Sequence, residues 1–183
     1  MELSADATIP FDRDRVFRAY RDDLSKLTEF LPNIRRIEVV EKEDKGSITE
    51  ILNVWHGGGD IPSAARVVLS ESMMSWKDYA IWNAEEYSCT WRIETNSFTE
   101  AVRCEGKNFF VETPEGTRLE IRGEIEIDAS KISGVPKLLR SSVSKTVTEF
   151  LCKKITPNLI EVSSGLTRFL QRQDRAEDRA EAS

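Results

Sequence analysis

The sequence predicts an α+β domain in which an antiparallel sheet of about seven strands packs against one long C-terminal helix. Apolar and polar residues alternate through most of the first 127 residues, and a single apolar stripe with spacings of three and four runs from residue 135 to about 171. Two short helical segments separate the first strand from the others. A sheet with one apolar face and a helix with one apolar stripe must cover each other.

The N-terminal segment predicts one strand and two short helices. Every second residue from 3 to 9 is apolar, which is the period of a half-buried strand. Asp12 stands where a helix cap is expected, ahead of a helix over residues 13–23. A second helical segment, residues 24–31, ends before Pro32, because proline cannot continue a helix.

The middle of the chain is typical of successive antiparallel strands. Strands are predicted at residues 35–42, 48–56, 64–71, 87–95, 99–113 and 117–128. Residues 75–83 fit either an additional strand or part of a long connection. A turn at residues 96 and 97 would place Trp91 opposite Val102, and a turn at residues 114–116 would place Gly106 opposite Gly123.

The C-terminal quarter predicts one long amphipathic helix and a tail. Pro157 must kink or restart the helix, and Thr156 is available to cap the restart. The last residues, 172–183, mix both charge signs with alanine and offer nothing to bury, so we expect a frayed helix end or a disordered tail.

Composition excludes several classes of protein. With 183 residues, 39% hydrophobic and 32% charged, the chain predicts one soluble globular domain. A formal charge of -6 argues against a nucleic-acid partner. The start lacks the pattern of a secretory signal and no stretch could span a bilayer, so we expect a cytoplasmic protein. Three cysteines without C-x-x-C spacing predict neither a disulfide framework nor a metal site, and no cofactor is indicated.

The order of elements resembles the helix-grip fold of the START-like, Bet v 1-like (SRPBCC) superfamily. The resemblance rests on the "DRDRVFRAY" helix after the first strand and the "GTRLEIRGEIEI" strand before the last helix, and it covers residues 1–171. It implies a curved sheet wrapped around the C-terminal helix, with a ligand cavity between them. Members of the superfamily bind lipids, sterols, hormones or polyketides, and a minority act as cyclases. Fold alone does not fix function.

The chain's single histidine stands in the string "HGGG", which matches the oxyanion-hole loop of esterases. That chemistry needs a G-x-S-x-G nucleophile elbow and a separate triad histidine, and the sequence has neither. A phosphate-binding loop would open a helix, whereas this loop leads into a predicted strand. His56 is therefore either a strand-end residue beside a flexible turn or a polar contact to a ligand.

The predicted cavity lies between one face of the sheet and the apolar stripe of the helix. Its expected lining residues are Val54, His56, Leu69, Trp91, Val102, Leu119, Ile121, Ile125, Leu139, Val143, Val147 and Phe150. In an antiparallel meander alternate connections fall at the same end of the sheet. The loops at residues 57–63, 96–98 and 129–136 would therefore form the cavity mouth if residues 75–83 are part of a connection and not a full extra strand. The expected mouth residues are Gly57, Gly58, Gly59, Asp60, Ile61, Pro62, Phe98, Ile132, Val135 and Pro136.

Three functions fit these features. The first is binding, and transfer within the cell, of an apolar small molecule such as a lipid or sterol; apolar loop tips beside Lys131 and Lys137 would suit transient contact with an anionic membrane. The second is a cyclase-like or hydrolase-like enzyme using the same cavity, with His56, Glu50 or Glu100 as its acid or base. The third is a partner-binding module with a filled core. The sequence predicts neither the ligand nor the oligomeric state.

Overall fold

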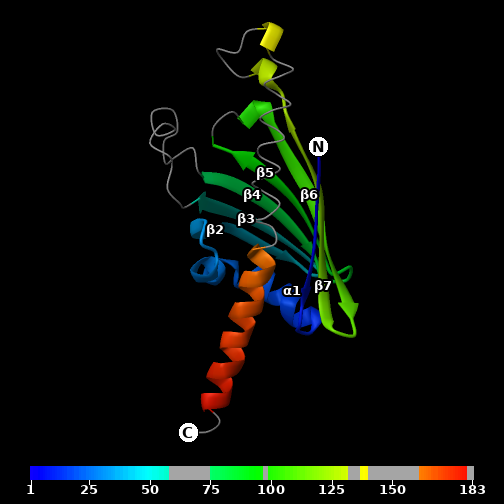
Figure 1. The fold of residues 1–183 in the computed structure, drawn as a ribbon, viewed down its shortest axis with the longest axis vertical. Coiled ribbons are helices and arrows are strands. Elements are labelled where there is room, and N and C mark those ends of the chain that lie inside the picture. Colours follow the sequence, from blue (N-terminus) through cyan, green and yellow to red (C-terminus); the bar gives the residue numbers. More distant parts are fainter. Residues whose placement is uncertain (58–74, 97–98, 132–136, 140–160, 181–183) are drawn as a thin grey trace.

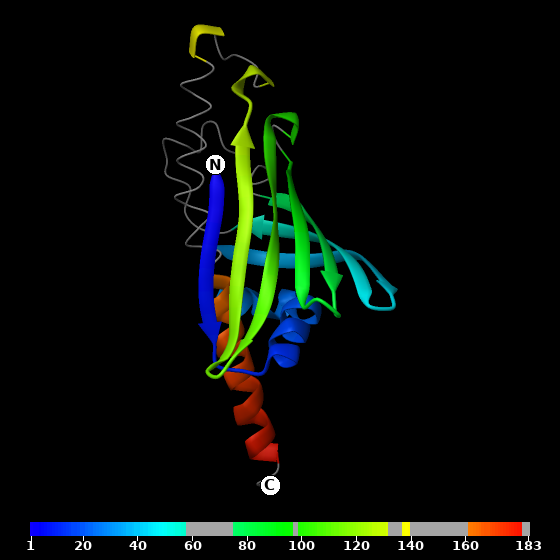
Figure 2. The same ribbon diagram turned by 90° about the vertical axis from the view of Figure 1, so that its right-hand side faces the viewer.

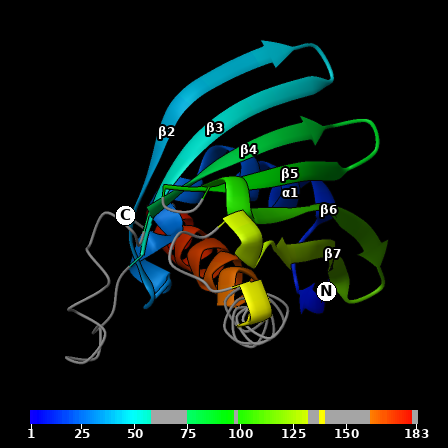
Figure 3. The ribbon, with the colours of Figure 1, turned by 90° about the horizontal axis from the view of Figure 1, so that it is seen from above.

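A computed structural model describes residues 1–57, 75–96, 99–131, 137–139 and 161–180. Seven antiparallel strands form one sheet in the order β1-β7-β6-β5-β4-β3-β2. The strands are β1 (Glu2–Ile9), β2 (Ile34–Lys45), β3 (Ile48–Gly57), β4 (Ser75–Asn83), β5 (Ser88–Thr95), β6 (Val102–Thr113) and β7 (Gly116–Ile127). The sheet curves around the C-terminal helix, residues 161–180, as Figures 1 and 3 show. The predicted α+β helix-grip fold is confirmed.

The helical elements follow the predicted order. α1 (Arg13–Asp22) and the 3-10 helix η1 (Leu24–Phe30) come directly after β1, and three further 3-10 turns are η3 (Thr99–Ala101), η4 (Ala129–Lys131) and η5 (Lys137–Leu139). Asp12 caps α1 as predicted, because its carboxylate accepts hydrogen bonds from the backbone N–H groups of Asp14 at 2.9 Å and Arg15 at 3.2 Å. Among the described residues, no helix is long and apolar enough to cross a membrane.

A hydrophobic core lies where α1 packs on the sheet, an arrangement that Figure 2 shows. Phe17 of α1 makes edge-to-face ring contacts with Trp82, Tyr87 and Phe110, with ring centroids 5.2 to 5.3 Å apart. Such contacts contribute about 0.5 to 1.5 kcal/mol each beyond the burial of the rings. Leu119, Phe17 and their neighbours are almost fully excluded from solvent, so this region holds the fold together.

Two opposed glycines allow β6 and β7 to approach the ring of Trp91. Gly106 lies opposite Gly123, as the turn at residues 114–116 predicts. A Cβ atom at Gly123 would stand 2.7 Å from the Glu105 carbonyl oxygen and 2.9 Å from Cη2 of Trp91. Because no side chain occupies this space, the indole of Trp91 can lie flat against the sheet.

The register of β5 and β6 differs from the expected one. Trp91 lies opposite Gly106 rather than Val102, and Ile93 lies opposite Cys104. The connection is longer than a two-residue turn, because it contains η3 before β6 begins. The displacement is an even number of residues, so Trp91 keeps the inward orientation that the sequence predicts.

Residues 75–83, which the sequence left open, form the complete strand β4 between β3 and β5. The strand expected at residues 64–71 lies outside the described residues. β4 pairs directly with β3. The C-terminal ends of β3, β5 and β7 therefore lie at the same end of the sheet. His56 pairs with Ser75, the Asn96 N–H donates to the Ser75 carbonyl, and the Asp128 N–H donates to the Ala101 carbonyl.

The C-terminal helix continues through residue 180, beyond the end predicted from its apolar stripe. The charged segment, expected to be a frayed helix end or a disordered tail, is helical over residues 172–180 and is tied to the N-terminal helices. Arg15 forms an ion pair with Asp174 at 2.5 Å, and Arg172 pairs with Glu29. The start of the predicted helix, including Pro157, lies outside the described residues, apart from η5.

Candidate ligand cavity

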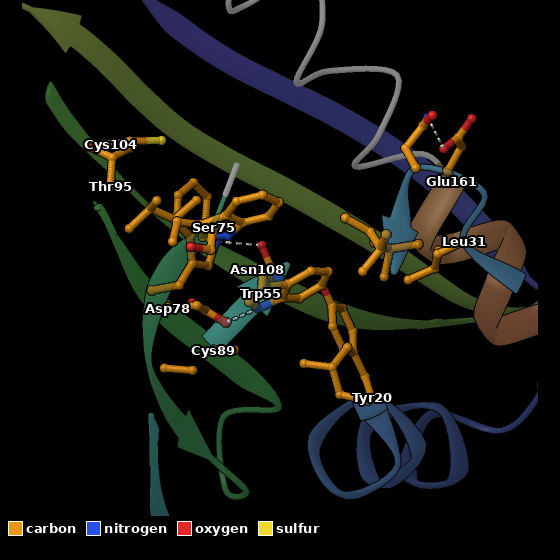
Figure 4. A pocket seen from close by; sticks show the side chains of 18 of the residues that line it. Tyr20, Leu31, Trp55, Ser75, Asp78, Cys89, Thr95, Cys104, Asn108 and Glu161 are labelled. Carbon is orange, nitrogen blue, oxygen red and sulfur yellow. Dashed lines mark hydrogen bonds between the residues drawn. The ribbon is translucent and has the colours of Figure 1, made fainter. Parts of the chain in front are cut away.

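A cavity of about 350 Å³ opens on the concave face of the sheet, between β3–β6, η1 and the start of the C-terminal helix. Figure 4 shows it from close by. The lining residues are mostly apolar and include four tryptophans. They are Tyr20, Leu24, Leu31, Asn33, Ile34, Trp55, Ser75, Trp76, Asp78, Ala80, Trp82, Cys89, Trp91, Ile93, Thr95, Val102, Cys104, Asn108, Ile125, Glu161 and Val162.

Aromatic rings dominate the sheet side of the cavity. Trp55 of β3 and Trp76 of β4 stack with their ring centroids 5.8 Å apart and their planes 15° from parallel. They are direct partners in the register of the two strands, so the backbone pairing itself brings the rings together. Trp82 and Trp91 add two more indoles to the lining. Flat rings of this kind favour a flat apolar ligand.

Asp78 of β4 is the charged group inside the sheet face. Its Oδ2 accepts one hydrogen bond from Asn53 Nδ2 at 3.3 Å. It accepts another from Trp55 Nε1 at 3.2 Å, which Figure 4 shows. Burial raises the pKa of the Asp78 carboxyl to about 6, against the opposing effect of these two hydrogen bonds. A carboxyl with this pKa exchanges protons near neutral pH.

Asn108 of β6 joins two aromatic residues of the lining. Its Oδ1 accepts a hydrogen bond of 2.8 Å from Trp91 Nε1, which fixes the orientation of that indole (Figure 4). Burial raises the pKa of the nearby Tyr20 hydroxyl, so the phenol stays neutral and can donate a hydrogen bond. Burial also raises the pKa of the Cys89 thiol, which makes it a poor nucleophile.

A second carboxylate lines the cavity from the helix side. Glu161, at the start of the described helical segment, accepts a hydrogen bond from Asn33 Nδ2 at 3.2 Å. Figure 4 places Glu161 and Leu31 together, away from Trp55. Within the described residues, no cluster of three or more histidine, cysteine or acidic side chains could hold a metal ion.

Five of the predicted lining residues of the sheet are inside the fold. Trp91, Val102 and Ile125 line the cavity. Leu119 and Ile121 are fully buried in the core instead, where β7 packs against β1 and α1. The residues predicted to face inward on β5, β6 and β7 therefore lie on the concave face of the sheet.

The structure reverses the predicted face of β3. Thr49, Ile51, Asn53 and Trp55 point inward, whereas Val54 and His56 lie on the outer face. His56 Nε2 is 3.4 Å from the Arg36 guanidinium and 3.7 Å from a Glu38 carboxylate oxygen. Both parities of this strand carry apolar residues, so alternation alone did not decide the face.

The acids that the sequence offered for catalysis lie outside the cavity as well. Glu50 shares the outer face with His56 and pairs with Lys45 at 3.0 Å. Glu100 is exposed in η3. Asp78 is the carboxyl that the sequence reasoning missed. Its signal was present, since Trp76, Asp78, Ala80 and Trp82 share one parity of β4.

The other predicted residues fall largely outside the described part of the chain. For the cavity these are Leu69, Val143, Val147 and Phe150, together with the side chain of Leu139. For the mouth, Gly57 ends β3, and the remaining residues Gly58, Gly59, Asp60, Ile61, Pro62, Phe98, Ile132, Val135 and Pro136 are not described.

No family model and no curated protein sequence matches the chain. Solved structures match its fold. The Zhui aromatase/cyclase from Streptomyces sp. R1128 gives a TM-score of 0.68 at 12% identity over 97% of both chains. TTHA0849 from Thermus thermophilus gives 0.61 at 20% identity, over 91% of this chain and 97% of that one. Norcoclaurine synthase from Thalictrum flavum gives 0.58 at 13% identity, over 93% and 86%.

These similarities show the shared helix-grip fold and nothing more specific, because the sequence identities are low. The aromatase/cyclase and the norcoclaurine synthase both have the Bet v 1-like fold. The chain therefore shares with them the fold in which a curved sheet packs against a C-terminal helix.

Proposed function

We propose that the protein binds an apolar, ring-bearing small molecule in the cavity between the sheet and the C-terminal helix. The observation that carries this proposal is the cavity of about 350 Å³ lined by four tryptophans. Sites for small molecules are typically hollows of about 300 to 1,000 Å³, mostly apolar, with a few polar groups that set orientation. An open cavity also favours this function over a partner-binding module with a filled core.

The lining supplies both affinity and orientation. Removing apolar ligand surface from water contributes about 25 cal/mol per Å², from which the cost of association must be subtracted. On the sheet side, Asp78 of β4 and Asn108 of β6 are polar residues of the lining, and they would set the orientation of a ligand with one polar end.

A cavity-filling substitution tests this proposal. Ala80→Phe adds a ring to a buried lining residue, and Ile81→Phe adds the same ring on the outer face, where the side chain is 47% exposed. Native mass spectrometry of freshly purified protein should show a bound apolar molecule in the wild type and in Ile81→Phe, and none in Ala80→Phe. An unliganded wild type that also fails to bind 2-ethylnaphthalene would contradict the proposal.

An enzyme using the same cavity is the second candidate, and Asp78 is the observation that favours it. A half-buried carboxyl whose pKa is raised to about 6 can donate or accept a proton at neutral pH. Wild-type protein and Asp78→Asn would be incubated with a mixture of small metabolites, followed by chromatography and mass spectrometry. A compound consumed only by the wild type supports catalysis; identical profiles contradict it.

Transfer of the ligand at a membrane surface is a further part of the proposal. Leu138 in η5 is 97% exposed, and Lys137 and Lys131 are close to it in the sequence. An exposed leucine beside lysines suits contact with anionic lipids. Leu138→Asp should slow transfer to vesicles that contain phosphatidylserine, with Phe109→Asp on the sheet as the control. Equal transfer rates would count against membrane contact.

A further inference from the structure

The charges that line the cavity have one sign. Asp78 contributes a carboxylate from β4 and Glu161 contributes another from the C-terminal helix. Among the residues that the structure describes, no lysine, arginine or histidine lines the cavity. Basic residues are plentiful elsewhere, with 26 lysines and arginines in the chain, so this bias is local. An anionic ligand would meet repulsion in this cavity.

The hydrogen bonds of Asp78 leave one carboxylate oxygen for a ligand. Both donors, Asn53 Nδ2 and Trp55 Nε1, bond to Oδ2. Within the described residues Oδ1 accepts no hydrogen bond, and it is not among the buried atoms that lack a partner. Because Asp78 lines the cavity, its second oxygen is available from the cavity side. Both donors on Oδ2 are neutral, so the charge of the ionised carboxylate is not compensated by them.

The rings next to Asp78 suit the same kind of ligand group. The faces of tryptophan rings attract cations, and indole is the most effective ring for this interaction. Trp55 and Trp76 stack beside Asp78, and Trp55 is bonded to it directly (Figure 4). A cation at this place would meet the carboxylate oxygen of Asp78 beside the stacked indoles of Trp55 and Trp76. That combination offsets the cost of removing a cation from water, which neither group offsets alone.

We infer that the ligand, if the proposed binding function is correct, carries a protonated amine on its apolar ring framework and that Asp78 Oδ1 pairs with this amine. The ammonium group donates a charge-assisted hydrogen bond to Oδ1, and the ring framework occupies the apolar space beneath Trp91. Cavity size, ring lining and charge thereby define one chemical class, an arylalkylamine or a larger ring system with a basic nitrogen.

Three probes of equal ring size test the inference by titration calorimetry. They are 2-(naphthalen-2-yl)ethylamine, its neutral isostere 2-propylnaphthalene, and the anionic 3-(naphthalen-2-yl)propanoate. In the wild type we expect the amine to bind about tenfold or more tightly than the neutral probe, and the carboxylate more weakly than either. If the neutral probe binds as tightly as the amine, the inference is overturned while the proposed function stands. If no probe binds, both are overturned.

Two variants test which carboxylate causes the preference for the amine over the neutral probe. Asp78→Asn keeps an acceptor for Asn53 and Trp55 and should reduce the amine-to-neutral ratio to about one, with the affinity for the neutral probe retained. Glu161→Gln, the matched change at the other acidic residue of the lining, should leave the ratio high. A ratio that survives Asp78→Asn and falls in Glu161→Gln overturns the assignment to Asp78. A single cooperative thermal unfolding transition, at or above the melting temperature of the wild type, establishes that both variants are folded.

Discussion

The concave face of the sheet has two parts that differ in how they are filled. Beside α1, the packed end consists of Phe17, Tyr87, Phe110 and Leu119, whose rings and aliphatic groups contact one another. Along β3 to β6, the cavity end places the amides of Asn53 and Asn108 and the Asp78 carboxyl inside the fold.

Burying polar groups costs stability unless they are well bonded, and folds tolerate that cost mainly at functional sites. The packed end and the cavity end are therefore expected to respond in opposite ways to substitution. Changes at the packed end should lower the free energy of unfolding. Replacing a polar group at the cavity end should weaken ligand binding and raise the free energy of unfolding.

The largest effect is expected at the packed end. Phe17→Ala removes a ring that makes three edge-to-face contacts and should lower the free energy of unfolding by about 3 to 5 kcal/mol. Phe109→Ala, at a ring that is 37% exposed on the outer face, should cost less than about 1 kcal/mol. Urea unfolding measures both. Equal losses would show that Phe17 is not central to the core.

At the cavity end, Asp78→Asn should increase stability at neutral pH. The pKa of Asp78 rises from 3.8 in the unfolded chain to about 6 in the fold. Between these values the folded protein holds a proton that the unfolded chain has released, so stability falls as pH rises from about 4 to about 6. The cost persists above pH 6, and its removal should add about 1 to 3 kcal/mol at pH 7.

Unfolding measured across pH 4 to 7 checks this expectation. Asp6→Asn is the control, because the hydrogen bond from Arg122 lowers the pKa of the exposed Asp6 carboxyl. Its contribution has the opposite sign: it is present above the unfolded pKa and is lost on acidification. A loss of stability at pH 7 in Asp78→Asn would show that the carboxylate stabilises the fold and would remove the contrast between the two ends.

An effect of similar size is expected where the two ends join, at the glycines under Trp91. Gly123→Ala brings a Cβ atom against the Glu105 carbonyl and the Trp91 ring, and should cost about 1 to 3 kcal/mol. It should also weaken binding of 2-ethylnaphthalene, because the displaced indole enters the cavity. Calorimetry and thermal unfolding measure these two quantities. An alanine variant with intact stability and affinity would show that the sheet moves to accept the methyl group.

The smallest effect concerns the end of the C-terminal helix. Asp174→Ala removes a half-exposed ion pair with Arg15 and should cost less than about 1 kcal/mol, and less still at high salt. Amide hydrogen exchange should show faster exchange in residues 172–180 alone. Faster exchange at the packed end would instead mean that this ion pair supports the whole core.

Local signals in the sequence predicted much of the fold. Asp12 capped α1 because an aspartate before a helical stripe is sufficient for that role. Gly106 lay opposite Gly123 because a proline and a glycine fixed the turn between β6 and β7. Trp91, Val102 and Ile125 were assigned to the cavity from simple alternation along strands with one apolar face.

The remaining features depend on contacts distant in sequence. Trp55 faces inward because it stacks on Trp76 and bonds to Asp78, and neither partner is visible within β3. Alternation along β4 places Asp78 on the same face as Trp76 and Trp82, but the two donors to its carboxylate lie on another strand, so its role in the cavity was missed. The helix over residues 172–180 is anchored by ion pairs to α1 and η1, more than 140 residues away, so its composition alone predicted only a frayed helix end or a disordered tail.

β2 forms one edge of the sheet, and its register against β3 shifts between Ile34 and Arg36 and again between Val39 and Glu41. Shifts of this kind twist an edge strand, and the charged side chains that follow Val40 would lose water if a second strand paired there. A second molecule therefore cannot continue the ladder of hydrogen bonds in register. The irregularity of β2 protects a sheet with an open edge against polymerisation into fibres, even though Val39 and Val40 leave two apolar side chains exposed there.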